Sequence, residues 1–394
     1  MINGQLARSM VASSISALAD RLAQMQLLSI VVLSGPGGEG FGSKSIVLLL
    51  PFLLLAAPAG FMADKWDRRR SQIALSLLRA LLVLSVPTLL TYQLASTTTV
   101  TVCLFCLLSF VAVSIPSYLV SLQENSKNTI AVYAGAMLLD LLATIAAVFI
   151  FATLSNFSFP HETLRICAIF YLISMFIWWT TRARAPVQPG NVSFLGYIKM
   201  HKFAAPCLRL IFLCDALCGL LYINFYLFCL QNVQLANEDT GKIFLTIACG
   251  FLSGTLIAIW SKTPAKQMLK FFLLESLIIY AFFCAAGSHE LLLAFSFLAG
   301  LSGACVFLHA NAQAQKLVPR QLRGQVIGAR ISVTTAILLA SSLSAEQLAI
   351  RYSGLTLMKI LSIESAVLGI LVFLFRNQVS RHLNKSPHLK IRVI

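Results

Sequence analysis

Charged residues are scarce in this chain. They make up 11% of the 394 residues, with 14 Asp and Glu against 30 Lys and Arg, whereas about 25% of an average soluble domain is charged. Hydrophobic residues reach 58%, more than a soluble globule of this size can bury. The 27 Phe exclude a disordered chain, because disordered segments are polar and poor in aromatic residues. The composition therefore predicts an all-α membrane protein with several spans.

The sequence also lacks the motifs of several enzyme classes. It contains no Gly-x-x-x-x-Gly-Lys-Ser/Thr loop for ATP, no His-Glu-x-x-His and no Gly-x-Ser-x-Gly. Its ten cysteines lie almost entirely in apolar stretches, where packing explains them better than metal or redox chemistry. We therefore expect no enzyme, no metal site and no cofactor. The basic residues cluster between apolar stretches, which indicates contact with a lipid bilayer and not with nucleic acid.

Twelve stretches are long and apolar enough to cross a bilayer, since a spanning helix needs about 20 mostly apolar residues. A polar, proline-containing segment divides them into two sets of six. We expect an N-terminal half at 1–181, a cytoplasmic linker at 182–205, a C-terminal half at 206–376 and a basic tail at 377–394. The predicted spans are 9–33, 43–63, 71–95, 98–120, 130–154, 165–181, 206–231, 241–261, 267–287, 291–315, 325–350 and 355–376.

The basic residues also predict the orientation of the chain. With the N-terminus in the cytoplasm, 21 of the 30 Lys and Arg fall on the cytoplasmic side and 5 on the opposite side. Loops that stay in the cytoplasm carry such an excess of Lys and Arg. We therefore expect an even number of spans, with both termini cytoplasmic.

The two halves repeat each other weakly in the same orientation. Asp20 in the first span matches Asp215 in the seventh, 195 residues later, and Gly135 matches Gly328, 193 residues later. Two parallel six-helix repeats are typical of carriers whose site lies near the bilayer midplane, between halves that rock against each other. The predicted fold is twelve transmembrane helices in two six-helix pseudo-repeats.

The loop after the second predicted span carries a family resemblance. It reads Gly60-Phe-Met-Ala-Asp64-Lys65-Trp-Asp67-Arg68-Arg69-Arg70. This resembles the signature Gly-x-x-x-Asp-Arg/Lys-x-Gly-Arg-Arg/Lys of the major facilitator superfamily, with Asp67 in place of the second glycine. The resemblance implies a secondary carrier that works by alternating access. It also implies that the aspartate caps a neighbouring helix and that basic residues latch the halves. The implied gate residues are Gly60, Asp64, Lys65, Arg68 and Arg69.

Three short patches resemble the lysophospholipid-transporter branch of that superfamily: Leu18–Arg21, Ser114–Glu124 and Asn311–Gln315. They imply a lysophospholipid moved across or into a bacterial inner membrane. The sequence departs from the branch in the seventh span, where Tyr222 stands in place of an arginine. Val318–Val326 resembles a loop of exporters in the same superfamily. A carrier of a small polar or amphipathic solute, driven by protons or sodium, is therefore the alternative, and a non-transporting receptor or scaffold is a third.

Polar residues within the predicted spans are candidate site residues, because charges at bilayer depth are costly and face a cavity or a partner. Asp20 and Arg21 point about 100° apart on one helix. We expect Asp20 to face the cavity, unless it forms a buried structural pair, and Arg21 to reach another helix. Asp140 is expected to pair with Arg21 or Arg330, or to carry a proton. The predicted substrate- or ion-binding residues are Asp20, Arg21, Asp140, Asp215, Asn311 and Gln315.

Overall fold

The computed structural model describes residues 4–34, 41–92, 96–124, 129–155, 160–181, 237–260, 289–316 and 318–351, with single positions at 212, 363 and 367. Throughout these ranges every regular element is a helix. The predicted spans at 206–231, 267–287 and 355–376 lie outside the described residues. The helices are α1 Gly4–Ser34, α2 Phe41–Lys65, α3 Arg68–Thr91, α4 Thr97–Glu124, α5 Thr129–Ser155, α6 Pro160–Thr180, α9 Asn237–Trp260, α11 His289–Lys316, the short 3-10 helix η1 Arg320–Leu322, and α12 Arg323–Arg351.

The other nine predicted spans each coincide with one of these helices. Six helical segments are long and apolar enough to cross a membrane, by length and composition, within the described part of the chain. In lipid, a helix satisfies its own backbone hydrogen bonds. A long apolar run of sequence therefore indicates both that the segment is a helix and where the helix approximately begins and ends. The six segments are Ile46–Lys65, Arg68–Leu89, Thr97–Leu122, Ala131–Leu154, Glu162–Thr180 and Arg320–Ser344.

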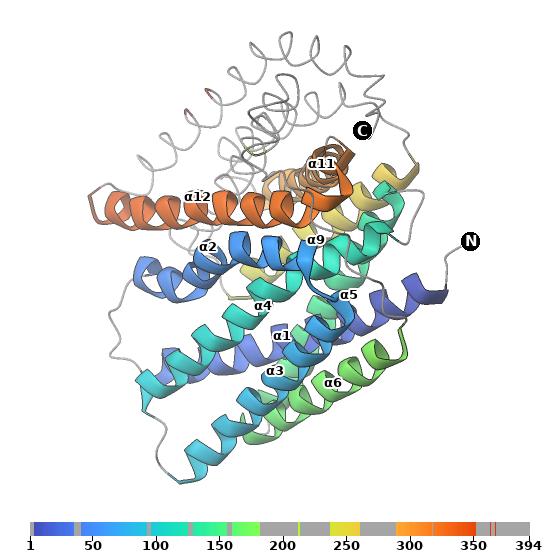
Figure 1. Ribbon diagram of the computed structural model, residues 1–394. Helices are drawn as coiled ribbons and strands as arrows, with labels where there is room; N and C mark the ends of the chain where they lie inside the picture. Colours follow the sequence, from blue (N-terminus) through green and yellow to red (C-terminus); the bar gives the residue numbers. More distant parts are fainter. Residues whose placement is uncertain are drawn as a thin grey trace. The chain divides into compact units, whose positions relative to one another are not determined.

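The chain divides into two compact units. The first comprises residues 1–191 and 320–339, and the second comprises 192–319 and 340–394. The first unit therefore includes the beginning of α12, a helix that the sequence assigns to the C-terminal half. In this unit α1 packs against α4, α5 and α6, α3 packs against α4 and α6, and α2 packs against α4 (Figure 1).

The core of the first unit is made mainly of small and aliphatic side chains from α1, α3, α4 and α6. Ala19, Leu22 and Leu27 contribute from α1, and Leu107 contributes from α4. Each of these four residues is fully buried. This apolar core surrounds a small set of buried polar groups, which are the first candidate site described below.

In the second unit, α9 and α11 are in close backbone contact. A Cβ atom added to Gly250 would lie 2.8 Å from the carbonyl carbon of Phe297, and one added to Gly300 would lie 2.9 Å from the backbone nitrogen of Phe251. Small residues allow membrane helices to approach this closely, so that van der Waals contact can hold them together without a hydrophobic driving force. Glycine is therefore required at both positions by the packing of the two helices.

Candidate functional site

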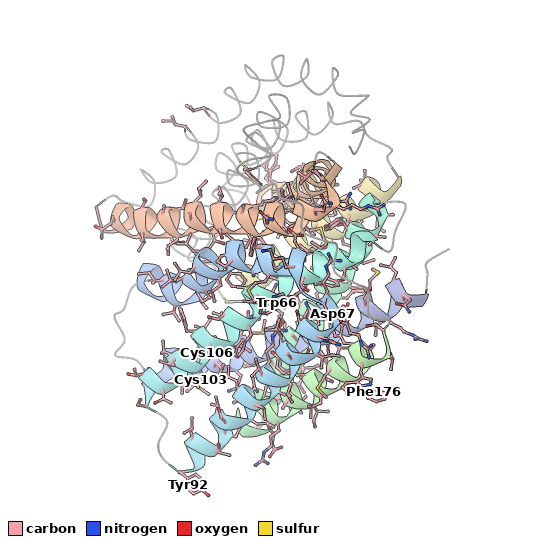
Figure 2. The ribbon with its side chains drawn as sticks, in the orientation of Figure 1. Trp66, Asp67, Tyr92, Cys103, Cys106 and Phe176 are labelled. Carbon is pink, nitrogen blue, oxygen red and sulfur yellow. The ribbon has the colours of Figure 1, made fainter. Side chains whose placement is uncertain are left out.

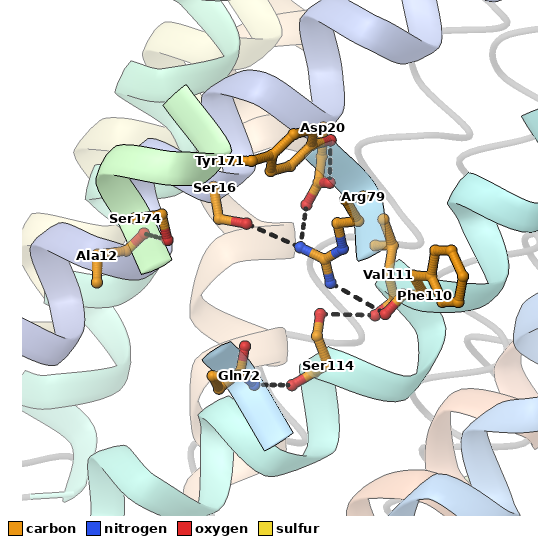
Figure 3. A network of polar contacts seen from close by, with 10 residues as sticks. All are labelled: Ala12, Ser16, Asp20, Gln72, Arg79, Phe110, Val111, Ser114, Tyr171 and Ser174. Carbon is orange, nitrogen blue, oxygen red and sulfur yellow. Dashed lines mark hydrogen bonds and ion pairs between the residues drawn. The ribbon is translucent and has the colours of Figure 1, made fainter. Parts of the chain in front are cut away.

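Asp20 on α1 lies at the centre of a buried polar network that reaches α3, α4 and α6, and Figure 3 shows its side chains. Its Oδ2 atom is 3.3 Å from Nη1 of Arg79 on α3, and its Oδ1 atom accepts a 2.7 Å hydrogen bond from the Tyr171 hydroxyl on α6. Arg79 also donates to Oγ of Ser16 at 2.8 Å and to the main-chain oxygen of Phe110, on α4, at 2.9 Å. The Asp20 carboxylate is thus directed into the N-terminal bundle.

The burial of this network determines its energetics. The exposed fractions of the side chains are 2% for Arg79 and 11% for Asp20, so solvent screens the pair very little. In such a setting the attraction between the two charges is strong, but it offsets a large desolvation cost only when further hydrogen bonds are made. Tyr171 and Ser16 provide such bonds. The geometry is that of a buried pair, and a substrate- or ion-binding role for Asp20 stays a prediction.

Arg21 and Asp140 form a second ion pair, between α1 and α5. Their Nη2 and Oδ2 atoms are 3.8 Å apart, and the side chains are 45% and 52% exposed. Asp140 is the only charged residue of α5. Because Asp20 and Arg21 point to different sides of α1, one helix contributes to a buried pair and to an exposed pair at nearly the same depth.

The remaining predicted site residues are on later helices. Asn311 is buried in α11, where its side-chain amide donates a 3.1 Å hydrogen bond to the carbonyl oxygen of Phe307 on the same helix. Gln315 lies in the last turn of α11, and its side chain is outside the described part of the structure. Asp215 lies outside the described residues altogether. Their proposed roles in substrate or ion binding stay predictions.

Asp64 is bound to the beginning of α12. Its carboxylate accepts hydrogen bonds from the backbone nitrogens of Gly324, at 2.8 Å, and Gln325, at 3.0 Å. The first amides of a helix have no partner within the helix, and the helix dipole places partial positive charge there. A buried carboxylate at this position satisfies two of those amides. Asp64 is 5% exposed, so the contact is shielded from water.

Three glycines allow α2 and α12 to come this close. A Cβ atom on Gly60 would overlap the carbonyl oxygen of Gly324 and lie 3.1 Å from the Cα atom of Gly328. A Cβ atom on Gly324 would lie 2.7 Å from Oδ1 of Asp64, and one on Gly328 would overlap the carbonyl oxygen of Ala56. We call these three glycines the glycine seam. The seam and the Asp64 contact form one joint between the two helices.

A model of the Major Facilitator Superfamily matches residues 5–343. The chain belongs to this superfamily. Members of the superfamily are membrane transporters whose fold has twelve spans, which agrees with the predicted fold class. The match covers both the Asp64 loop and most of α12. No curated protein sequence matches the chain.

Solved structures of major facilitator proteins share this fold. The chain resembles a proton:xylose symporter bound to 6-bromo-6-deoxy-D-glucose, with a TM-score of 0.70, 10% identity and 96% of each chain covered. It resembles the E. coli fucose:proton symporter with a TM-score of 0.70, 13% identity, and 94% of this chain and 98% of that chain covered. For a nucleoside transporter the TM-score is 0.63 at 17% identity, with 94% and 99% covered. Identities this low show the fold alone.

The basic residues of the superfamily loop contact nearby groups of the N-terminal bundle. The Lys65 ammonium lies 4.0 Å above the ring of Phe61. Arg68 donates from Nε to the carbonyl oxygen of Ala63 at 3.1 Å. Arg69 donates to the carbonyl oxygen of Trp179 at the end of α6, where a cation is favoured by the helix dipole. The roles of these three side chains in a gate stay predictions.

Asp67 occupies the turn between α2 and α3, next to Trp66 (Figure 2). This is the position where the superfamily signature has its second glycine. The Oδ1 atom of Asp67 accepts a 3.0 Å hydrogen bond from the backbone nitrogen of Arg69. Asp67 therefore caps the N-terminus of α3, since aspartate is among the residues preferred at an N-cap. The turn tolerates the loss of the glycine because its replacement stabilises the helix that follows.

We expect Asp67→Ala to lower the free energy of unfolding by about 0.5–2 kcal/mol, because alanine cannot accept the hydrogen bond at the N-cap. Asp67→Ser should retain most of the stability, since a serine hydroxyl can also accept that bond. Thermal unfolding midpoints in detergent will compare the two variants. The pair between Asp67 and Arg70, at 3.6 Å with Arg70 87% exposed, should contribute little. Equal losses in both variants would contradict the capping role.

Three side chains of the buried network, those of Ser16, Arg79 and Tyr171, were not predicted as site residues. Arg79 lies in an otherwise apolar stretch of α3, and a buried cation needs an anionic partner. That rule could have indicated Arg79 as a partner of Asp20. Tyr171 had no comparable signal, because aromatic residues are common in apolar spans. Its role is apparent only from its 2.7 Å hydrogen bond to Asp20.

Proposed function

We propose that this transporter is a secondary carrier that moves lysophospholipids across or into the inner membrane by alternating access. The observation that carries the mechanism is the contact of the Asp64 carboxylate with the first amides of α12, 2.8 and 3.0 Å away. The contact links the loop of the N-terminal half to a helix that the sequence assigns to the C-terminal half. It therefore joins the elements that must separate if the halves rock.

The chemistry of this joint suits a latch. The Ser332 hydroxyl of α12 also accepts from the backbone nitrogen of Ala57 at 3.1 Å and donates to the carbonyl oxygen of Phe52 at 3.4 Å. Separation of the helices would break these bonds, the two bonds to Asp64 and the contacts of the glycine seam. Once the helices part, water can solvate both Asp64 and the amides of Gly324 and Gln325. We expect the free energies of the closed and open states to differ by only about a few kcal/mol. A ligand that binds one state more tightly can shift an equilibrium of that size. We propose that Lys65, Arg68 and Arg69 complete this latch on the cytoplasmic side.

The substrate part of the proposal is supported by the three patches that resemble lysophospholipid transporters. Leu18–Arg21 lies on α1, Ser114–Glu124 on α4 and Asn311–Gln315 on α11. A site with few charges, lined by apolar helices, suits a ligand that has a polar headgroup and one acyl chain. Tyr222, in place of the arginine of that branch, implies that the headgroup depends on other residues here. We propose Asp20, Asp215, Asn311 and Gln315 for the site, with Arg21 and Asp140 as charge partners.

The second candidate is a carrier of a small polar or amphipathic solute driven by protons or sodium. Two of the similar structures are named as proton symporters, for xylose and fucose. The buried Asp20 carboxylate favours this candidate, because a carboxylate next to Arg79 changes its charge when it takes up a proton. In such a cycle, protonation of Asp20 would release Arg79 from the ion pair.

The test is translocation of lysophosphatidylethanolamine in proteoliposomes, with and without an imposed proton or sodium gradient. We expect the wild type to translocate it and Asp64→Ala to lower the initial rate about tenfold or more, because hydrogen bonds to a charged group contribute about 1.5–3 kcal/mol each. Glu162→Gln is the control, since Glu162 forms an exposed pair with Arg165, which should have little effect.

The outcomes separate the parts of the proposal. No translocation by folded, inserted protein would contradict the lipid substrate, and gradient-driven uptake of a small solute would then identify the second candidate. Binding of lysophosphatidylethanolamine without flux would indicate a receptor or scaffold. Wild-type rates in Asp64→Ala would contradict the latch. Loss of gradient dependence in a folded Asp20→Asn variant would support Asp20 as the coupling residue.

A further inference from the structure

The two ion pairs of α1 differ in a way that a purely structural role does not explain. Asp20 and Arg79 are buried and make further hydrogen bonds within the bundle. Arg21 and Asp140 are 45% and 52% exposed and 3.8 Å apart, which is too long for a hydrogen bond. Exposed pairs contribute little to stability because solvent screens them, so Arg21 and Asp140 add little to the packing of α1 on α5.

The exposed pair lies at mid-helix, which corresponds to bilayer depth in the predicted spans 9–33 and 130–154. Arg21 lies near the middle of α1 and Asp140 near the middle of α5, whose other residues are uncharged. Charged side chains at this depth face a protein interior or a water-filled cavity, because lipid cannot solvate them. The exposure of both side chains excludes the interior of the N-terminal bundle. A water-filled cavity is then the surrounding that can solvate the face that they share.

Because their charged atoms are 3.8 Å apart, Arg21 and Asp140 can each bind a ligand group. Arg21 has five N–H donors in a planar fork that matches a phosphate or carboxylate, and Asp140 is an acceptor for an amine.

We propose that Arg21 and Asp140 together bind a zwitterionic substrate, with Arg21 on its anionic group and Asp140 on its amine. This inference rests on the proposed carrier function and names the chemical class of its substrate. An ammonium and a phosphate or carboxylate on one molecule replace the two partners of the pair at once, so binding leaves neither Arg21 nor Asp140 as an unpaired charge at bilayer depth. A lipid headgroup and a free zwitterion share this chemistry.

The first test compares three probes by microscale thermophoresis on purified protein in nanodiscs. Lysophosphatidylethanolamine carries both charges on a lipid, glycerophosphoethanolamine carries the same headgroup without the acyl chain, and lysophosphatidylglycerol carries the anion alone. We expect Arg21→Gln to weaken binding of all three about tenfold or more. Asp140→Asn should weaken only the two zwitterions by this factor and leave lysophosphatidylglycerol within about twofold. Equal effects of Asp140→Asn on all three probes would overturn the proposal.

The second test exchanges the charges. Arg21→Asp combined with Asp140→Arg keeps an ion pair but reverses its direction, so the unfolding midpoint should stay near that of the wild type while zwitterion binding becomes at least tenfold weaker. If the exchanged variant binds the zwitterions as the wild type does, the proposal fails. The neutral double variant, Arg21→Gln with Asp140→Asn, avoids an unpaired charge. It should keep the unfolding midpoint of the wild type and lose zwitterion binding, and wild-type binding by it would overturn the proposal.

These probes also distinguish the two proposals. Selective binding of glycerophosphoethanolamine, with no translocation of either lysolipid, would support the zwitterion site and contradict the lipid substrate. Translocation of lysophosphatidylglycerol and lysophosphatidylethanolamine at equal rates, unchanged in Asp140→Asn, would support the lipid carrier and contradict the zwitterion site.

Discussion

Arg79→Leu is expected to lower the free energy of unfolding by about 3–5 kcal/mol, the range for breaking a buried ion pair by removing one partner. The Asp20 carboxylate would keep its hydrogen bond from Tyr171 but lose Arg79, its only cationic partner within ion-pair distance among the described residues. Leucine also leaves Ser16 and the carbonyl oxygen of Phe110 without their donor. Thermal and denaturant unfolding in detergent will measure the loss.

The double variant Arg79→Leu with Asp20→Asn should recover part of that loss. A neutral amide in place of the carboxylate removes the unpaired charge, and its oxygen can still accept from Tyr171. A double-mutant cycle isolates this coupling from the other effects of each change. Arg165→Gln is the matched control, because the Arg165–Glu162 pair is shorter, at 2.7 Å, but 58% and 51% exposed, and should lose under about 1 kcal/mol. A loss in Arg79→Leu as small as that of the control would contradict the structural importance of the network.

The same double variant distinguishes two roles for Asp20. If the pair only stabilises the bundle, a folded double variant should transport in the same gradient-dependent way as the wild type. If Asp20 couples transport to an ion, the double variant should fold and bind substrate but lose the effect of the gradient. Transport and unfolding must therefore be measured on the same preparation.

Gly60→Ala is expected to abolish the close approach of α2 and α12. The new methyl group would overlap the carbonyl oxygen of Gly324 and lie 2.9 Å from its carbonyl carbon, and backbone atoms cannot move aside as the end of a side chain can. Overpacking of this kind costs about 1–3 kcal/mol. The helices must separate to accept it, which would lengthen the Asp64 contacts to Gly324 and Gln325. Transport should fall about tenfold or more, as in Asp64→Ala.

A matched glycine provides the control for this variant. A Cβ atom on Gly135 would meet only the terminal Cε atom of Met10, at 3.1 Å, and that flexible side chain can shift. Gly135→Ala should therefore retain transport and stabilise α5, since alanine has the higher helix propensity. The distance between spin labels on α2 and α12 will show whether Gly60→Ala parts the helices. An unchanged distance with normal transport would contradict the role of the glycine seam.

Much of the fold could be predicted from the sequence because it depends on local properties. The length of each apolar run predicted nine of the described helices, since a helix in lipid must satisfy its own backbone groups. The loop from Gly60 to Arg70 indicated the superfamily because its residues are contiguous. The contact of Asp64 with a helix N-terminus followed from the resemblance, and the structure shows which amides it binds.

The candidate site was less predictable, because it depends on which helix faces which. The polarity of the spans indicated that Asp20 and Arg21 need partners, and a helical turn of about 100° per residue implied that the two point apart. Nothing local could indicate that Arg79 and Tyr171, 59 and 151 residues away, converge on Asp20.

The sequence by itself determined that this protein spans the membrane many times, where its described helices lie and which superfamily loop it carries, because composition and contiguous motifs are properties of the chain. Only the tertiary structure decided that Asp20 is buried against Arg79 while Arg21 and Asp140 stay exposed. The physical reason is that neighbouring residues of one helix point to different surroundings, and the packing of α1 against α5 and α6 determines which surroundings are dry.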